Sequence, residues 1–393
     1  MALVFFALLS SAVGAWPGAC PLGGNERRHL DAARTEGMPD LAVALQLSSQ
    51  KIHESTAGQS EPTPNSLTQG GFKPGDLPHN AGQSPSVHDV CQDFLLRDKA
   101  KNAIALSPRA SPAKLIDTFA FVDSYEVEEL LLRFYEMGEE VSEIHIVEGD
   151  RDFTGGMKPY NFDALLNSGQ LDPWKNKITY HQVKIPEGVK GYAIQGFQRR
   201  ELRSQMNWLK DYDQSDMLLE SDLDEIVSHK VLRALKWCKP GGGVWRSHVR
   251  MKDLTYSVAW SRLSGFSDYP TTVGFMSEHE GEVPKLARDL GFIDRPNELS
   301  AMDGSHVAWH FSFMLNSSAL AHKLFIRVEG RFHYAQGFQT EADLATFIEN
   351  TFYSDPSRHD PEIHPSNVGK KDLPQALSEH PEKFPNILRN VTW

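Results

Sequence analysis

Apolar residues recur with strand-like and helix-like spacing from residue 113 onward, and this pattern predicts one folded region. Short apolar runs alternate with longer segments in which apolar residues return about every three to four positions. The predicted strands are 115–121, 143–147, 177–183 and 217–219, and the predicted helices are 125–137, 197–212 and 228–237. Alternating strands and helices are typical of a mostly parallel sheet covered by helices on both faces, so we predict an α/β fold.

The first 112 residues have a different pattern. Residues 3–16 are apolar and small residues follow them, as in a secretory signal, although no basic side chain precedes the run. A membrane span needs about 20 apolar residues, so residues 1–19 are predicted to be a signal peptide or a short anchor. Residues 20–112 are predicted to be a low-complexity stem, because 54–86 is rich in Gly, Pro, Ser, Thr and Gln. The folded domain is then 113–393.

Two acidic residues directly follow the last predicted strand of the first half. Residues 217–219 are apolar, and Asp222 and Asp224 come next. Carboxylates two positions apart point to the same side of an extended chain, and such a pair suits a divalent cation bound to a diphosphate. The alternative is a helix N-terminus decorated with acids, because Ser228 looks like the first residue of a helix. The apolar run before the acids favours the ligand site.

Other charged residues lie where a ligand of a parallel sheet would bind, beyond the carboxyl ends of the strands. Glu148 and Asp150 end the strand 143–147, and Lys158 lies in the loop that follows. Lys158 and the pair Arg199–Arg200 on the second helix could neutralise a diphosphate. The alternative for Glu148 and Asp150 is a solvated strand end, and the alternative for Lys158 is an exposed side chain. For Arg199 and Arg200 it is a surface face that forms salt bridges. His310 lies in the apolar segment 306–315, where a core histidine is the usual interpretation.

Charge and cysteine content limit the possible functions only partly. The net charge is −12, so the chain has no overall positive field for nucleic acid. The three cysteines can form at most one disulfide, so their number does not fix the compartment. The sequence shows no serine nucleophile elbow, His-x-x-x-His zinc pair or phosphate-binding Walker loop.

Four blocks, in order, resemble glycosyltransferase family 17, the β-1,4-mannosyl-glycoprotein 4-β-N-acetylglucosaminyltransferases. The acidic block 221–226 is the most similar, although Val227 stands where Pro is usual. The blocks that carry the resemblance are 116–121 with Glu126 and Arg133, 146–148 with 153–155 and 158–159, 221–226, and 308–312. The region between Cys238 and Ser305 matches poorly.

The resemblance implies a GT-A-like fold, UDP-N-acetylglucosamine as donor, a mannose-containing N-glycan-like acceptor, and Mn²⁺ or Mg²⁺ as cofactor. It also implies inversion at the anomeric carbon. Under this hypothesis the metal ligands are Asp222, Asp224 and His310, and the donor-binding residues are Asp222, Glu148, Lys158 and Arg200. A carboxylate removes the proton from the acceptor hydroxyl, and the candidates for this general base are Glu298, Asp303 and Asp294.

Two other functions stay open on the residues alone. The same acids could serve a metal-dependent phosphoester hydrolase, or hold a structural cation in a non-catalytic sugar-binding protein. The N-terminal signal predicts entry into the secretory pathway, with membrane association only through the N-terminus if it is uncleaved. Together with the family resemblance, the expected location is the Golgi lumen, or the protein is secreted. The sequons at Asn316 and Asn390 support that location only slightly.

Overall fold

The structure, a computed structural model, describes residues 86–98, 102–206, 215–241, 246–249, 251–266, 272–275, 297–326, 338, 340–358 and 363–391. The predicted signal or anchor (1–19), the predicted stem up to residue 85, and Asp294 lie outside these residues. The chain divides into two units, and every described residue belongs to the unit that contains Gly70–Trp393.

Four parallel strands form one half of a ten-stranded sheet, which confirms the parallel arrangement predicted for this part of the chain. In spatial order they are β5 (Ile178–Val183), β4 (Glu143–Gly149), β3 (Leu115–Ala120) and β6 (Met217–Glu220). Every residue of β3 and all but the first of β4 are buried. Burial on both faces explains why these runs are apolar without strict alternation.

The other half of this sheet is mostly antiparallel, so the prediction of a mostly parallel sheet is wrong for the sheet as a whole. Among its described strands, β9 and β13 form the one parallel pair. The order continues from β6 through β12 (Thr272–Phe275), β9 (Arg246–Val249), β13 (Asn297–Ala301), β1 (Phe94–Asp98), β2 (Ala103–Pro108) and β8 (Cys238–Pro240). These strands are short, and distant segments pair in them, so local spacing did not predict them.

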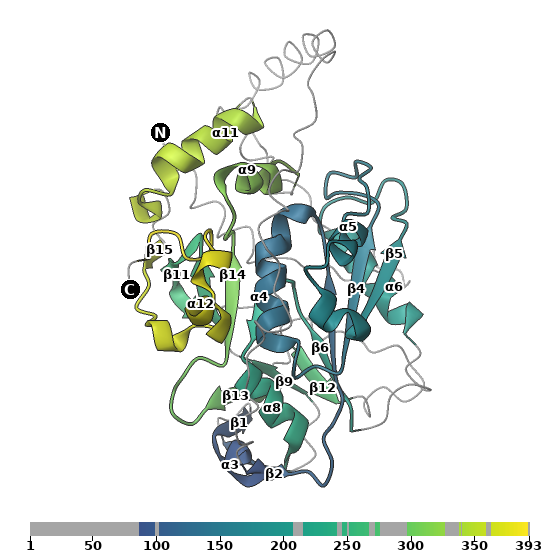
Figure 1. Ribbon diagram of the computed structural model, residues 1–393, viewed down its shortest axis with the longest axis vertical. Coiled ribbons are helices and arrows are strands. Elements are labelled where there is room, and N and C mark those ends of the chain that lie inside the picture. Colours follow the sequence, from purple (N-terminus) through teal and green to yellow (C-terminus); the bar gives the residue numbers. More distant parts are fainter. Residues whose placement is uncertain are drawn as a thin grey trace, which may run out of the picture. The chain divides into compact units, whose positions relative to one another are not determined.

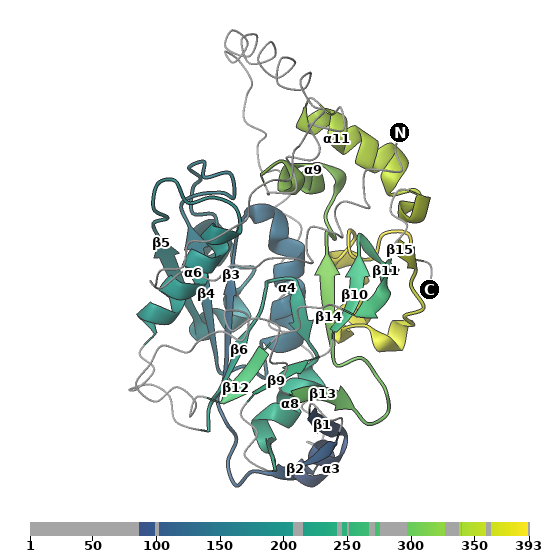
Figure 2. The same cartoon turned by 180° about the vertical axis from the view of Figure 1, so that it is seen from behind.

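Helices cover both faces of the parallel half (Figures 1 and 2). Leu130 and Phe134 of α4 (Val127–Met137) share a core with Phe119, whereas Ile194 of α6 (Tyr192–Gln205) packs in a separate core with Ala120. Neighbouring residues of a strand point to opposite faces, so α4 and α6 lie on opposite sides of β3. The remaining helices of this part are α5 (Phe162–Asn167) and α8 (His229–Trp237).

A second, five-stranded sheet begins where β6 ends. Its order is β15 (Ile363–Pro365), β11 (Ser257–Phe266), β10 (Met251–Thr255), β14 (Ala308–Ser312) and β7 (Glu225–Val227). β10 and β14 are parallel, and the other described pairs are antiparallel. The chain therefore passes from the first sheet to the second between Glu220 and Glu225.

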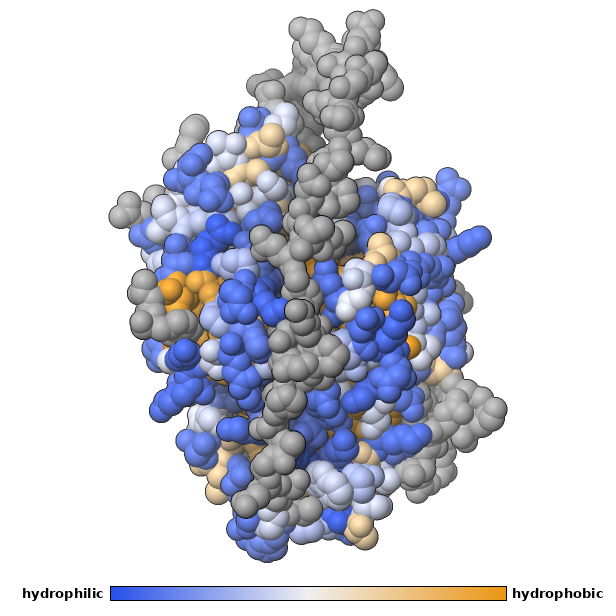
Figure 3. Space-filling model, in the orientation of Figure 1, coloured by the Kyte–Doolittle hydropathy of each residue, from blue (hydrophilic) through white to orange (hydrophobic). Residues whose placement is uncertain are grey.

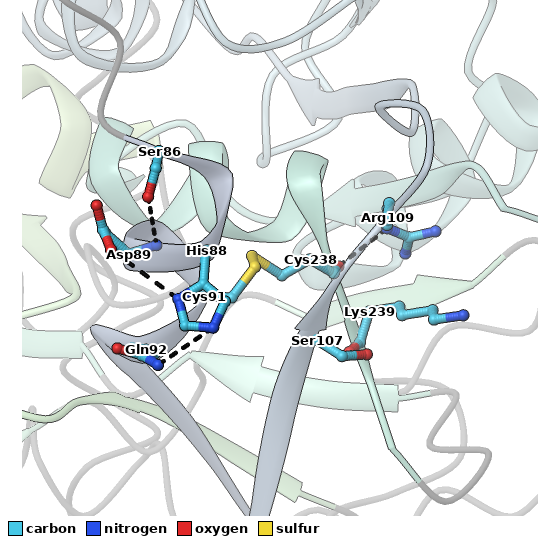
Figure 4. Close-up of a disulfide and its surroundings, with 9 residues drawn as sticks. All are labelled: Ser86, His88, Asp89, Cys91, Gln92, Ser107, Arg109, Cys238 and Lys239. Atoms are coloured by element: carbon cyan, nitrogen blue, oxygen red, sulfur yellow. Dashed lines mark hydrogen bonds and ion pairs between the residues drawn. A yellow bond between two sulfur atoms is a disulfide. The ribbon is translucent and has the colours of Figure 1, made fainter.

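The folded part begins earlier than predicted. The helix α3 (Val87–Gln92) precedes β1, and β1 and β2 belong to the large sheet. A disulfide joins Cys91 of α3 to Cys238, the first residue of β8 (Figure 4). Residues 86–98 and 102–108 are therefore part of the folded domain, and the predicted stem boundary at residue 112 is corrected. Pairing with β13 and the disulfide are long-range contacts, which the short local pattern of this segment did not reveal.

The C-terminal part adds helices and a second apolar cluster. Its helices are α9 (Ser317–Ile326), α11 (Glu341–Phe347) and α12 (Gln375–Glu379), and its shorter helical turns lie at Ile348–Phe352, Pro356–Arg358, Lys370–Asp372 and Pro381–Lys383. Two further short turns, Ser124–Glu126 and Asp172–Lys177, belong to the earlier part of the chain. None of the described helices is both long and apolar enough to cross a membrane. The face shown in Figure 3 is mostly hydrophilic, with small separate apolar patches.

Candidate functional site

The two predicted metal-binding aspartates lie in the link between the two sheets. Residues 221–224, called the acidic turn below, follow β6 and precede β7. The turn closes on itself, because the backbone N–H of Asp222 donates to Oε2 of Glu225 at 2.9 Å and that of Glu225 donates to the carbonyl of Asp222 at 3.1 Å. β3, β4 and β6 are parallel and end at the same edge, so the acidic turn lies where ligands of such sheets bind.

Asp222 contacts the helix α6. Its Oδ1 accepts hydrogen bonds from Nε2 of Gln195, at 2.9 Å, and from the guanidinium of Arg199. Gln195 and Arg199 are four residues apart and so share one face of α6. Arg200, which was predicted to bind the donor, is exposed and lies over the ring of Phe197 instead. The contact to the acidic turn is made by the neighbouring Arg199.

Asp224 lies beside the predicted histidine ligand. Its Oδ1 is 3.7 Å from Nε2 of His310, whose Nδ1 is 3.4 Å from Oδ1 of Asp253. Strand pairing brings these residues together, because β14 lies between β10 and β7 and His310 is in register with Asp253. Burial opposes a charge on His310, but the carboxylates of Asp224 and Asp253 outweigh it and raise the pKa of the imidazole to about 9.

The three predicted metal ligands do not form one preassembled cluster. Asp224 and His310 are neighbours, whereas the carboxylate of Asp222 is held by α6. Within the described ranges, no group of three or more His, Cys, Asp or Glu side chains is arranged to hold a metal ion. Carboxylate oxygens and an imidazole nitrogen are nevertheless donors that Mn²⁺ or Mg²⁺ accepts. The pair of Asp224 and His310 supplies two of them when the imidazole has lost its proton, as cation binding requires.

Glu148 and Lys158, predicted to bind the donor, bind each other in the interior. The Glu148 side chain is fully buried, and its Oε1 accepts from Nζ of Lys158 at 2.5 Å. Further donors to its carboxylate are the N–H groups of Asn161 and Phe162 and the hydroxyl of Tyr180. With four donors already in place, this carboxylate fixes the loop after β4. The positions of Glu148 and Lys158 therefore do not support donor binding.

The described structure places two of the three predicted bases on or just after β13. Glu298 lies on β13, which is three strands away from β6, or roughly 14 Å at the usual strand spacing. Asp303 lies beyond the end of β13, where its carboxylate accepts from the N–H of Ser305 at 2.9 Å. That hydrogen bond lowers the pKa of Asp303. Asp294 lies outside the described residues.

Several residues of this site were missed at the sequence level. Arg133, fully buried on α4, lies under the acidic turn in an ion pair with Asp117 of β3. An arginine in the buried stripe of a helix and an aspartate in an apolar strand were signals of a buried pair. Asp253 is likewise an acid within an apolar strand, and 4 % of it is exposed. Arg199 was named together with Arg200, but no signal told which of these two adjacent arginines contacts Asp222.

Comparison with known proteins identifies the family. The model of glycosyltransferase family 17 matches residues 79–276, half of the chain. A search of curated proteins found no match. Similar solved structures include an active-site mutant of LgtC (11 % identity, 70 % of this chain and 97 % of that one, TM-score 0.27) and the galactosyltransferase LgtC with donor and acceptor sugar analogues (12 %, 70 % and 97 %, 0.27). The glycosyltransferase GlyE of Streptococcus pneumoniae TIGR4 is a third (11 %, 66 % and 56 %, 0.22).

The TM-scores of these solved structures do not establish a shared fold, so the assignment depends on the family match. That match contains β3, α4, β4, α6, the acidic turn and β10, which build most of the site described above, whereas β14 with His310 lies beyond it. The chain belongs to glycosyltransferase family 17.

Proposed function

We propose that the protein is an inverting, metal-assisted transferase with a GT-A-like fold. It moves N-acetylglucosamine from UDP-N-acetylglucosamine to a mannose-containing, N-glycan-like acceptor. Family membership supports glycosyl transfer, and the observation that carries the proposal is the pairing of Asp224, on the acidic turn, with His310 of β14. Donor, acceptor and cofactor are proposed from the resemblance of the acidic turn and of the block 308–312 to the family.

Asp224 and His310 are the residues that would hold the divalent cation. Small divalent cations in nucleotide sites are usually bound by one or two carboxylates together with substrate phosphates and water. A site with two protein donors is therefore adequate for a cation that arrives with a nucleotide diphosphate. When bound, the cation would supply Lewis-acid stabilisation of the charge on the departing diphosphate.

Asp222, Gln195 and Arg199 form the other side of the proposed donor site. The guanidinium of Arg199 is a planar donor that suits phosphate oxygens as well as a carboxylate. Asp222 holds this guanidinium at the edge of the turn, close to where the diphosphate would lie beside Asp224. Asp222 would contact the cation or the ribose, and Arg199 would take part of the negative charge of the diphosphate.

The acceptor hydroxyl needs a carboxylate to take its proton. Asp294 keeps this role as a proposal, because Glu298 lies three strands away from β6 and the carboxylate of Asp303 is engaged by the backbone of Ser305. The test is the acceptor-dependent rate in Asp294→Asn. A strong loss of kcat with an unchanged affinity for UDP would support this assignment, and an unchanged kcat would contradict it.

We also propose a location in the secretory pathway, in the Golgi lumen. The disulfide between Cys91 and Cys238 is a bond that forms and persists in oxidising compartments. The predicted signal at residues 1–19 points to the same location. Immunofluorescence of the full-length protein with a Golgi marker tests this proposal, and a diffuse cytosolic signal would contradict it.

The donor site is tested by the melting temperature of the full-length protein with UDP-N-acetylglucosamine, with and without Mn²⁺. A ligand that binds only the folded state raises the melting temperature by mass action. We expect a rise that needs both components and is lost in Asp224→Ala. Release of phosphate or free sugar without an acceptor would favour the hydrolase, and binding without any turnover would favour a sugar-binding protein. The absence of any shift with nucleotide sugars would contradict the proposal.

A further inference from the structure

A single buried guanidinium holds the backbone of the acidic turn. Arg133 is 1 % exposed, and its Nη1 donates to the carbonyl oxygens of Asp222 at 3.0 Å, Leu223 at 3.3 Å and Glu225 at 2.7 Å. Its Nη2 donates to Oγ of Ser221 at 2.6 Å. The guanidinium thus contacts three residues of the turn and Glu225, which directly follows it, without contacting the carboxylates of Asp222 or Asp224.

The guanidinium is itself fixed from the side of the sheet. Asp117 of β3 binds it with both carboxylate oxygens, Oδ2 to Nε at 2.9 Å and Oδ1 to Nη2 at 2.5 Å. Its carbon Cζ lies 4.5 Å from the centre of the Phe119 ring. A two-point pair of this kind sets the plane of the guanidinium as well as its position. Arg133 therefore cannot follow a movement of the turn.

The contacts determine which way the turn faces. Because the carbonyl groups of Asp222, Leu223 and Glu225 converge on Arg133, the carbonyl side of the turn faces α4. The side chain of Asp222 reaches α6 and that of Asp224 reaches His310. Without the guanidinium, three converging carbonyl dipoles would repel one another in a buried place and the turn would relax. A lysine would keep the charge, but it cannot reproduce the planar set of donors.

We propose that Arg133 is the positioning residue of the donor site, which sets the carboxylates of Asp222 and Asp224 for cation and nucleotide. This inference rests on the proposed function. The role is geometric, because Asp117 neutralises the guanidinium and leaves little net charge to act on the aspartates. Removing the residues that orient metal ligands commonly weakens metal binding by about 10- to 100-fold. We expect a loss of that size in Arg133→Lys.

The experiment measures the affinity of the full-length protein for Mn²⁺ with UDP by calorimetry, together with the melting temperature. Lys177→Met is the matched control. Lys177 also donates to three backbone carbonyls of a turn, those of Gly138, Glu139 and Val141, but that turn follows the end of α4 and is not the acidic turn. We expect both variants to melt at a lower temperature. In folded protein, only Arg133→Lys should lose affinity for Mn²⁺ and UDP, with partial recovery of transfer at high Mn²⁺.

Wild-type affinity in folded Arg133→Lys, or an equal loss in Lys177→Met, would overturn the inference. If Arg133→Lys does not fold, Ser221→Ala removes a single contact of the guanidinium, and unchanged affinity in that variant would overturn it as well. A wild-type protein that binds neither Mn²⁺ nor UDP would instead contradict the proposed function.

Discussion

The guanidinium of Arg199 is ion-paired with the carboxylate of Asp222, across the space between α6 and the acidic turn. This relationship separates two adjacent arginines that the sequence does not distinguish. Successive residues of a helix are about 100° apart around its axis, so Arg200 points away from Arg199. Arg200 is exposed and lies over Phe197. The pair therefore provides a test of the donor site with a control one residue away.

We expect Arg199→Gln to raise the KM for UDP-N-acetylglucosamine by about tenfold or more, because a hydrogen bond to a charged group contributes roughly 1.5 kcal/mol or more. Arg200→Gln should leave KM within about twofold, since changes to exposed side chains usually have small effects. Steady-state kinetics at saturating Mn²⁺ would measure both. The reverse result would restore the sequence-level assignment of Arg200 and place the donor on another face of α6.

The buried pair of Glu148 and Lys158 should affect stability far more than catalysis. Glu148→Gln leaves the ammonium of Lys158 without its counter-charge, and breaking a buried pair costs about 3–5 kcal/mol. Urea unfolding measures this loss, which should be partly restored in Glu148→Gln/Lys158→Met. At a temperature where Glu148→Gln is folded, the KM for the donor should stay near that of the wild type. A large rise in KM without loss of stability would show that Glu148 binds the donor after all.

The disulfide should be a main contributor to the stability of the folded domain. Cys91 and Cys238 are separated by 147 positions, and closing a loop of this length in the unfolded chain corresponds to about 5 kcal/mol in the chain-entropy model. The double variant Cys91→Ala/Cys238→Ala should unfold at a lower urea concentration, and the wild type should approach it on addition of reductant. Wild-type protein that is indifferent to reductant would show that the bond does not form.

The sequence predicted the position and type of the elements that form the site, but it did not predict the contacts between them. The apolar run 217–219 followed by Asp222 and Asp224 located the turn, because burial and a strand end both leave a local pattern. The contact of His310 with Asp253 depends on the register of β14 and β10, which are far apart in the sequence. Strand pairing of that kind has no signal in a single sequence.

The sequence also did not reveal which charged residues are buried. Glu148 follows an apolar strand just as Asp222 and Asp224 do, and the local patterns are alike. The loop after β4 folds back, and the backbone N–H groups of Asn161 and Phe162 donate to Glu148. Glu148 is therefore buried although it lies at the end of a strand. The segment 86–108 was assigned to the stem for a related reason, since its strands are stabilised by partners more than a hundred residues away.

A pair of histidines predicts how stability depends on pH. His145 and His181 lie on neighbouring strands with Nδ1 and Nε2 3.1 Å apart. Burial lowers the pKa of both side chains below 6.5, and the charge of His181 lowers that of His145 further. In the unfolded chain both take up protons near pH 6.5, whereas the folded protein resists protonation. Stability is then unaffected above pH 6.5 and falls below it, by up to about 1.4 kcal/mol per pH unit for each residue.

The free energy of unfolding in urea, measured between pH 5 and pH 7.5, would test this dependence. His145→Gln/His181→Gln should flatten the slope below pH 6.5, with the remaining slope due to other groups. His88→Gln is a suitable control, because His88 is exposed on α3. A slope unchanged in the double variant would show that the pair does not control stability in this range.

Asp253 provides the last test, because it touches His310 from the side opposite to Asp224. With its Oδ1 3.4 Å from Nδ1 of His310, Asp253 keeps Nε2 directed toward Asp224, which is the orientation that a shared cation requires. Carboxylates that hold a metal-binding histidine in this way typically contribute about 10- to 100-fold in metal affinity. We expect Asp253→Asn to weaken Mn²⁺ binding by that factor, while Asp224→Ala should abolish it.

Thr255→Val, two residues along the same strand and also buried, is the control for effects on packing. Unchanged Mn²⁺ affinity in Asp253→Asn, with the expected loss in Asp224→Ala, would show that the strand register and the hydroxyl of Ser312, 3.1 Å from Nε2, hold His310 without Asp253. An equal loss in Thr255→Val would instead mean that β10 acts through its packing against β14.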